Sequence, residues 1–310
     1  MEHRALGRSG IEVSRLILGC GNFGGIGSSP AFFGQGETEE QAAAIMDAAW
    51  ESGIMTFDAA DAYGGGRSET FIGNWLRSRR VRPVLTTKTF NPMTEGADSG
   101  LSRERIQRQL DSSLERLGVE RVDLYLSHAM DQATPVQETV SAFDELRREG
   151  VIGAWGGSNV DAAWIEEARP AWVQNSYSLL DREDEGSVLP ICAREGLGYT
   201  PFSPLAGGWL TGKYRRGEEP PAGSRMTLRP EPYEHLRDDR TYDALDAFEG
   251  LAGERGTTPA TLAIAWLLAQ PHVTAVVIGA RRPEQLRPAL EALELQLSPP
   301  EAESIAAVFA

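Results

Sequence analysis

Polar side chains stand near the ends of three short apolar runs. Asp58 lies near the end of the first run and Tyr63 follows five residues later, whereas Lys88 and His128 are the last residues of the next two runs. The carboxyl ends of parallel strands meet on one face of a barrel, so these four side chains are expected to converge. Singly, each has an ordinary structural explanation, such as a helix cap or a core histidine. Together they indicate a reactive site.

The four residue types suit the reduction of a carbonyl group. A carbonyl that accepts hydride needs an acid to protonate the developing alkoxide, and the phenol of Tyr63 is a poor acid with an ordinary pKa of about 10. A lysine cation at about 4 Å favours the phenolate by roughly 4 kcal/mol at an effective dielectric near 20. Lys88 is therefore predicted to lower the pKa of Tyr63 towards neutrality. Asp58 would keep Lys88 charged, and His128 would donate to the carbonyl oxygen.

Other chemistries have less support in the sequence. Of the four histidines, only His128 falls at a predicted strand end, and no spaced Cys/His set of the kind that binds zinc is present. No metal site is predicted, although a carboxylate-bound magnesium ion is compatible with the sequence. The serine of GGSN (156–159) is not flanked as G-x-S-x-G, so a nucleophile elbow is not predicted either.

Eight apolar runs predict the strands that would position these residues. They cover 15–20, 55–60, 84–88, 122–128, 152–158, 172–177, 198–204 and 274–280. Helical patterns with capping residues lie between them, at 38–53, 102–118, 134–150 and 258–270. This alternation favours a closed (β/α)8 TIM barrel over an open doubly wound sheet. The glycines after the first run match G-x-G-x-x-G only loosely, and no acidic ribose partner follows.

Two long segments interrupt the alternation. The glycine-rich segment 22–37 contains Phe32 and Phe33, and the proline- and arginine-rich segment 211–240 follows the seventh predicted strand. Long loops on the carboxyl face of a barrel usually carry function. Residues 298–309 predict an extra helix at the C-terminus.

The composition argues against several classes of partner. The chain of 310 residues has 30 Lys and Arg against 45 Asp and Glu, a net charge of −15, which disfavours nucleic acid and anionic membranes. Its two cysteines predict no disulfide framework, and no signal peptide or membrane span is predicted. We therefore expect a cytoplasmic protein that acts on small molecules and is able to form oligomers.

The ordered motifs resemble the aldo-keto reductase family over nearly the whole chain. Residues 4–25 resemble its N-terminal hairpin and first strand. FDAADAYG matches its Asp-x4-Tyr motif, TTK its lysine strand and DLYLSHAMD its histidine strand, and GGSNV, VQNSYSLLDR, FSPLAGGWLTGKY and VVIGARRPEQL match its cofactor segments. The resemblance is closest to bacterial members related to the potassium-channel β subunits. It implies one barrel domain over 1–310.

The resemblance also implies a role for each matching residue. Tyr63 would be the general acid/base, Lys88 its pKa modulator, Asp58 the partner of the lysine and His128 the group that orients the carbonyl. The nicotinamide would be held by Ser158, Asn159 and Gln174 at its carboxamide and by Phe202 beneath its ring, where the family usually has tyrosine. The pyrophosphate would lie against Ser203, Pro204, Leu205, Gly207 and Leu210, assisted by Lys213 and Arg225.

The residues after the last predicted strand bear on cofactor choice. Gly279 and Arg281, followed by Arg282, stand where the family binds the adenosine 2′-phosphate, and arginine suits phosphate because its charged fork is bidentate. NADP(H) is therefore predicted over NAD(H). Family members usually carry a Glu-Asn adenine contact where this chain has Pro288 and Ala289. This departure would either weaken cofactor binding or shift the adenine contacts to Gln285.

The leading functional prediction is an NADP(H)-dependent reductase of aldehydes or ketones, run reversibly. Aromatic residues in the long loops predict an apolar substrate pocket, with Phe23, Phe32, Phe33, Phe90 and Trp209 as candidates for its walls. Two alternatives stay open. One is a cofactor-binding sensor or partner subunit with little turnover, and the other is a barrel lyase or isomerase that uses the same acid/base residues.

Overall fold

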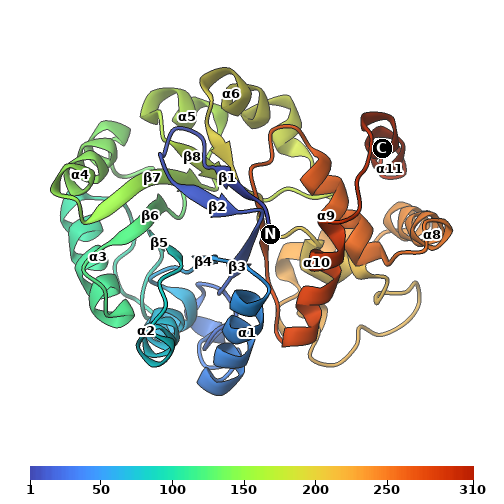
Figure 1. The fold of residues 1–310 in the computed structure, drawn as a ribbon, viewed down its shortest axis with the longest axis horizontal. Helices are drawn as coiled ribbons and strands as arrows, with labels where there is room; N and C mark the ends of the chain where they lie inside the picture. The colour runs from blue at the N-terminus through green and yellow to red at the C-terminus, as the bar shows by residue number, and fades with distance from the viewer.

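Eight parallel strands form the centre of the structure, a computed structural model that describes all of residues 1–310 (Figure 1). The order around the sheet is β10-β3-β4-β5-β6-β7-β8-β9. Between its two edges, the backbone N–H of Thr274 donates to Tyr199 and that of Val277 donates to Pro201, at 2.8 and 2.9 Å. The predicted (β/α)8 barrel is confirmed. Its strands are β3 (Leu16–Gly19), β4 (Thr56–Asp58), β5 (Val84–Thr89), β6 (Val122–Ser127), β7 (Ile152–Ser158), β8 (Trp172–Gln174), β9 (Gly198–Tyr199) and β10 (Val276–Ile278).

Helices surround the ring of strands (Figure 1). Several begin where the sequence predicted: Thr38 forms a capping box with Gln41, and Ser102 accepts from the backbone N–H of Arg105. The helices are α1 (Glu39–Glu51), α2 (Arg67–Arg79), α3 (Arg103–Leu117), α4 (Val136–Glu149), α5 (Ala162–Ala168), α6 (Val188–Glu195), α7 (Arg225–Leu228), α8 (Asp239–Glu254), α9 (Pro259–Ala269), α10 (Arg287–Ala292) and α11 (Pro299–Ala307). None of them combines the length and the apolar character needed to cross a membrane.

An N-terminal hairpin closes one end of the barrel. Its strands β1 (His3–Ala5) and β2 (Glu12–Ser14) pair antiparallel, and they lie across the ring of strands in Figure 1. The hairpin residues Leu6 and Val13 pack in one buried cluster with barrel side chains that include Leu124 and Trp172. The amino end of the barrel is therefore filled with apolar side chains, which leaves the carboxyl ends of the strands for a site.

The strands β8 and β9 are shorter than the sequence predicted. Runs 172–177 and 198–204 were expected to be extended throughout, but regular pairing stops at Gln174 and Tyr199. A single bridge between Ser176 and Phe202 continues the contact. Pro201 and Pro204 lack the N–H that a ladder needs, so the chain leaves the sheet there.

The two long segments carry short helical turns. The glycine-rich segment contains a 3-10 helix at Pro30–Phe32, and a bridge pairs Gly25 with Phe33. The arginine-rich segment contains α7 and a 3-10 helix at Glu231–Leu236. Both segments follow carboxyl ends of barrel strands, so they border the same face as the predicted reactive residues.

Candidate active site

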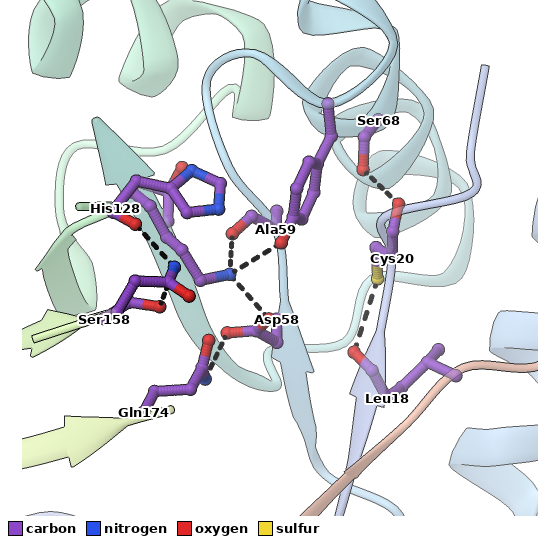
Figure 2. A network of polar contacts seen from close by, with 12 residues as sticks. Leu18, Cys20, Asp58, Ala59, Ser68, His128, Ser158 and Gln174 are labelled. Carbon is purple, nitrogen blue, oxygen red and sulfur yellow. Dashed lines mark hydrogen bonds and ion pairs between the residues drawn. The ribbon is translucent and has the colours of Figure 1, made fainter. Parts of the chain in front are cut away.

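The ammonium of Lys88 is the centre of a buried polar cluster at the ends of β4 and β5. Figure 2 shows Asp58, Ala59 and His128 in this cluster. Its Nζ donates to Asp58 Oδ2 at 2.6 Å, to the carbonyl oxygen of Ala59 at 2.8 Å and to the phenol oxygen of Tyr63 at 3.3 Å. Parallel pairing places Asp58 beside Thr86, so that Asp58 and Lys88 stand two residues apart in register. Three acceptors satisfy all three ammonium protons, and a fully buried lysine needs such partners to stay charged.

A glutamine from the opposite side of the barrel completes the shell around Asp58. The Nε2 of Gln174, at the end of β8, donates to Asp58 Oδ1 at 3.0 Å (Figure 2). Both carboxylate oxygens are thus engaged, and the side chains of Asp58 and Gln174 are buried. This contact was not foreseen, because the sequence assigned Gln174 to the nicotinamide alone. Its Oε1 has no hydrogen bond within the protein and is free to accept one.

Three glycines hold Tyr63 in place. Gly64, Gly65 and Gly66 have φ of 59°, 68° and 90°, a left-handed conformation that other residues adopt only at a cost. A Cβ on Gly64 would lie 2.7 Å from the carbonyl oxygen of Phe23, so this turn also lacks room for a side chain. This turn after Tyr63 leads directly into α2.

His128 faces Tyr63 across the end of the barrel. The centroids of their rings lie 5.4 Å apart and the rings meet edge to face. The backbone N–H of His128 donates to Thr89, and its carbonyl oxygen accepts from Asn159 Nδ2 at 2.8 Å. Its Nδ1 is buried and has no partner. The structure therefore brings all four predicted reactive residues to one place.

The protonation states differ in one respect from the prediction. Burial raises the pKa of Tyr63 by more than the nearby Lys88 ammonium lowers it, so the net direction is upward from 10.0. The prediction that Lys88 brings this pKa towards neutrality is wrong in its net direction, because it left out the cost of burying a phenolate. Burial lowers the pKa of Lys88, but Asp58 and Tyr63 raise it more, and the net direction is upward.

The imidazole of His128 is neutral near pH 7. Burial, reinforced by the positive charge of Lys88, lowers the pKa of His128 well below 6.5. The cluster thus combines a charged ammonium, a protonated phenol and a neutral imidazole. A carbonyl oxygen placed between the phenol and the imidazole would find two hydrogen-bond donors, and the phenol would be able to give up its proton.

The candidate carboxamide contacts line the neighbouring strand ends. Ser158 ends β7 and is buried, and its Oγ accepts from Asn159 Nδ2 at 3.2 Å. Asn159 has φ of 54°, which turns the chain sharply out of the strand. Phe202 is partly exposed beyond β9, where the bridge to Ser176 fixes its backbone. With Gln174, these residues border one edge of the Lys88 cluster.

The loop after β9 has the backbone of an anion cradle. Ser203 and Ala206 have φ of 55° and 44°, and Gly207 and Gly208 have φ of 64° and 99°. Successive left-handed residues turn peptide N–H groups towards one side of a loop. Lys213 lies against this turn, since a Cβ on Gly208 would be 2.4 Å from its Nζ. The other predicted members of the loop, Pro204, Leu205 and Leu210, belong to the same turn.

Positive charges border that loop. Partial burial lowers the pKa of Lys213, and the charges of Arg225 and Arg281 lower it further. Burial likewise lowers the pKa of Arg225, which donates to Asn22 Oδ1 at 3.2 Å and forms no salt bridge. Lys213 and Arg225 are cations without a carboxylate partner, and such cations make a place suited to an anion. The donor set fits the pyrophosphate of a dinucleotide.

Residues after β10 form the outer border of the site. Gly279 is exposed, and the backbone N–H of Arg281 donates to Gln285 Oε1 at 2.8 Å. Arg281 forms a salt bridge with Glu37, whereas the exposed Arg282 pairs with Glu284. Arg281 is therefore held in orientation by Glu37 at one of its guanidinium nitrogens.

The structure divides the predicted pocket aromatics into two groups. Phe32, Phe33 and Phe90 are partly exposed, and the ring of Phe33 lies against the turn at Gly65. Phe23 and Trp209 are buried in the main core instead. They leave no side-chain surface for a substrate, so we do not place them in the pocket.

Sequence reasoning missed a buried acidic pair behind the site. Asp61 accepts from the backbone N–H of Ala62 at 2.6 Å and is fully buried. Burial, with the neighbouring Glu69, raises the pKa of Asp61 to about 7. Glu69 is also buried, and Arg116 donates to it at 2.7 Å. Nothing in the sequence around Glu69 indicated that this charged residue of α2 would face the interior.

Comparison with known proteins assigns the chain to a family. The model of the Aldo/keto reductase family matches residues 15–310. An uncharacterized oxidoreductase of Bacillus subtilis is 38% identical over 96% of this chain and 92% of its own. A probable voltage-gated potassium channel subunit beta of Oryza sativa is 36% identical over 95% of this chain and 92% of its own. The NADH-specific methylglyoxal reductase of Escherichia coli is 33% identical over 96% of this chain and 95% of its own.

A solved structure shows the same fold. The glycerol dehydrogenase of Gluconobacter oxydans superimposes with a TM-score of 0.85 and 26% sequence identity, covering 99% of this chain and 95% of its own.

Proposed function

The chain belongs to the aldo/keto reductase family, and we propose that it is an NADP(H)-dependent oxidoreductase that interconverts an aldehyde or ketone with the corresponding alcohol. The observation that carries the proposal is the bonding of Lys88, whose ammonium is shared among Asp58, Ala59 and Tyr63. A buried, fully satisfied lysine that also touches a phenol has a chemical use in proton transfer.

The residues divide the chemistry between them. When bound, the nicotinamide supplies hydride to the carbonyl carbon and is itself oxidised. Tyr63 gives its phenolic proton to the carbonyl oxygen, and the adjacent Lys88 cation stabilises the phenolate that remains. His128 is neutral and donates to the same oxygen from its Nε2. This hydrogen bond fixes the position of the carbonyl relative to Tyr63. In the reverse direction Tyr63 takes the proton from an alcohol.

The cofactor would lie along the strand ends from β7 to β10. Ser158, Asn159 and the free Oε1 of Gln174 would bond its carboxamide, and Phe202 would lie beneath its ring. The loop from Ser203 to Lys213 would hold the pyrophosphate. Beyond β10, Arg281 keeps its Nη2 free of protein partners, and a guanidinium suits a phosphate, which supports NADP(H) over NAD(H).

Two measurements test the proposal. Purified protein is mixed with NADPH and a panel of aldehydes, ketones and glyoxals, and absorbance of the reduced nicotinamide is followed. We expect turnover that Tyr63→Phe reduces by at least about 100-fold while cofactor affinity is kept. Full activity in Tyr63→Phe would refute the assigned acid. Titration with NADPH and with NADH, followed by the fluorescence of the seven tryptophans, then tests cofactor choice. Tighter binding of NADH than of NADPH would refute the proposed preference for NADP(H).

A second candidate is a cofactor-binding partner subunit with little turnover. The similarity to a probable potassium channel subunit beta favours it. Tight binding of NADPH without oxidation by any member of the panel would support this candidate. A barrel lyase or isomerase would instead convert substrate without any change in nicotinamide absorbance.

A further inference from the structure

A buried carboxylate neutralises the arginine that would bind the adenosine 2′-phosphate. Glu37 ends the glycine-rich segment just before α1, and it is 4% exposed. Its Oε1 accepts from Arg281 Nε at 2.5 Å, although the two residues are 244 positions apart in sequence. The contact joins the loop after β3 to the loop after β10.

The rest of the Arg281 side chain is held as well. Its Nη1 donates to the carbonyl oxygen of Gly223 at 2.7 Å, and its backbone N–H is bonded to Gln285. Nη2 is the one guanidinium nitrogen without a protein partner. Since the side chain is 38% exposed, that nitrogen remains available to a ligand from the solvent side. Glu37 therefore fixes both the orientation and the net charge of the arginine.

Glu37 has little else to balance its charge. Its Oε2 is buried without a hydrogen bond. Burial raises the pKa of Glu37, while Arg281, and more weakly Arg225, lower it. A buried carboxylate with one close cation depends on that cation. A ligand that draws Arg281 away, or that adds negative charge beside the pair, is therefore opposed.

We propose that Glu37 is a specificity-determining residue that limits the preference of this chain for a 2′-phosphorylated dinucleotide. The inference rests on the proposed function and refines its choice of cofactor. A free arginine would attract the doubly charged 2′-phosphate strongly. In the pair with Glu37 that attraction is largely cancelled, because the buried carboxylate repels the phosphate. An uncharged 2′-hydroxyl is not repelled and can bond Nη2, so NADH binds as well.

The test measures affinity rather than activity. Wild type and Glu37→Gln are titrated with NADPH and NADH, and with adenosine 2′,5′-bisphosphate and 5′-AMP as probes that differ only in the 2′-phosphate. Loss of the negative charge is expected to tighten the binding of NADPH and of adenosine 2′,5′-bisphosphate by about tenfold, and to change the binding of NADH and 5′-AMP by less than about threefold. The gain should shrink with added salt, as a charge effect does.

Two further variants separate charge from structure. Glu37→Met removes the charge without leaving a polar group that needs a hydrogen bond. It should shift the ratio of NADPH to NADH affinity in the same direction as Glu37→Gln. Glu166→Gln removes an exposed carboxylate from its salt bridge with Arg194, outside the site, and should leave the ratio of NADPH to NADH affinity unchanged.

The possible failures are distinguishable. If wild type binds dinucleotides but Glu37→Gln and Glu37→Met keep its NADPH to NADH ratio, the inference about Glu37 is overturned while the proposed function stands. If wild type binds neither dinucleotide, the proposed function fails and the inference fails with it. Equal tightening of all four ligands in Glu37→Gln would also overturn the inference, because a loosened loop would act on both cofactors alike.

Discussion

The ammonium of Lys88 lies closer to Asp58 than to Tyr63: Nζ is 2.6 Å from Asp58 Oδ2 and 3.3 Å from the phenol oxygen. The cation is therefore primarily the partner of a carboxylate. Its effect on Tyr63 is too small to offset the burial of the phenol, and the pKa of Tyr63 is raised. In the proposed reaction, Lys88 would thus stabilise the phenolate after proton transfer rather than create it beforehand.

This relationship predicts a flat pH profile for carbonyl reduction. Burial raises the pKa of Tyr63 above 10.0, and burial lowers the pKa of His128 well below 6.5. The proton donor is then protonated and the imidazole neutral throughout the range between about pH 6 and 9, so kcat should be nearly constant there. The measurement is kcat for reduction at saturating cofactor. A basic limb with a midpoint near 7 or 8 would contradict the raised pKa.

Replacing Lys88 by methionine should damage both activity and stability. The variant leaves the Asp58 carboxylate buried with Gln174 as its remaining side-chain donor, which costs about 3–5 kcal/mol of unfolding free energy. We expect kcat to fall by at least about 100-fold because the phenolate loses its cation. Urea unfolding and steady-state kinetics check the two effects.

The double variant Asp58→Asn with Lys88→Met separates the effect of Lys88 on stability from its effect on activity. It removes both charges, so stability should recover towards wild type while activity stays low. Recovery of activity together with stability would show that Lys88 acts only on the fold.

Gly64→Ala should loosen the turn that carries Tyr63. The residue has φ of 59° and its new Cβ would lie 2.7 Å from the carbonyl oxygen of Phe23. Gly96 is a matched control, since its φ is 75° but nothing lies within 4 Å of a Cβ there. Gly96→Ala is expected to cost about 1 kcal/mol through backbone strain alone. Gly64→Ala should cost more than that and should also lower kcat/KM. Equal stabilities and unchanged kinetics in the two variants would refute the steric argument.

The barrel and the placement of the reactive residues were predictable because they depend on local patterns. Apolar runs, caps and glycine stops gave the order of strands and helices, and Lys88 and His128 stand at strand ends, where the direction of a side chain follows from the fold. The lengths of β8 and β9 were overestimated, because the composition of the runs outweighed the effect of Pro201 and Pro204.

The missed features are those that depend on contacts across the barrel. The bond between Gln174 and Asp58 joins residues 116 positions apart, and the pair of Glu37 and Arg281 joins loops at two ends of the chain. No local pattern indicates that a glutamate before a helix will be buried. The direction of the Tyr63 pKa was also missed, because it depends on how much water reaches the phenol.

Asp61→Asn should make the protein more stable at alkaline pH. Burial, with the charge of Glu69, raises the pKa of Asp61 from 3.8 to about 7. The native state therefore holds this proton more tightly than the unfolded chain, whose aspartates titrate near 3.9. The stability that the protonated carboxyl contributes is complete below about pH 4 and is lost as the pH rises through about 7.

Asparagine is never charged and keeps an oxygen for the backbone N–H of Ala62. At pH 8 we expect Asp61→Asn to exceed wild type by up to about 4 kcal/mol in unfolding free energy, and at pH 5 by less than half of that gain. Urea unfolding at the two pH values measures the difference, and Asp111→Asn, at an exposed position in α3, is the control. A gain of the same size at both pH values would show that packing, and not the buried charge, limits stability at this position.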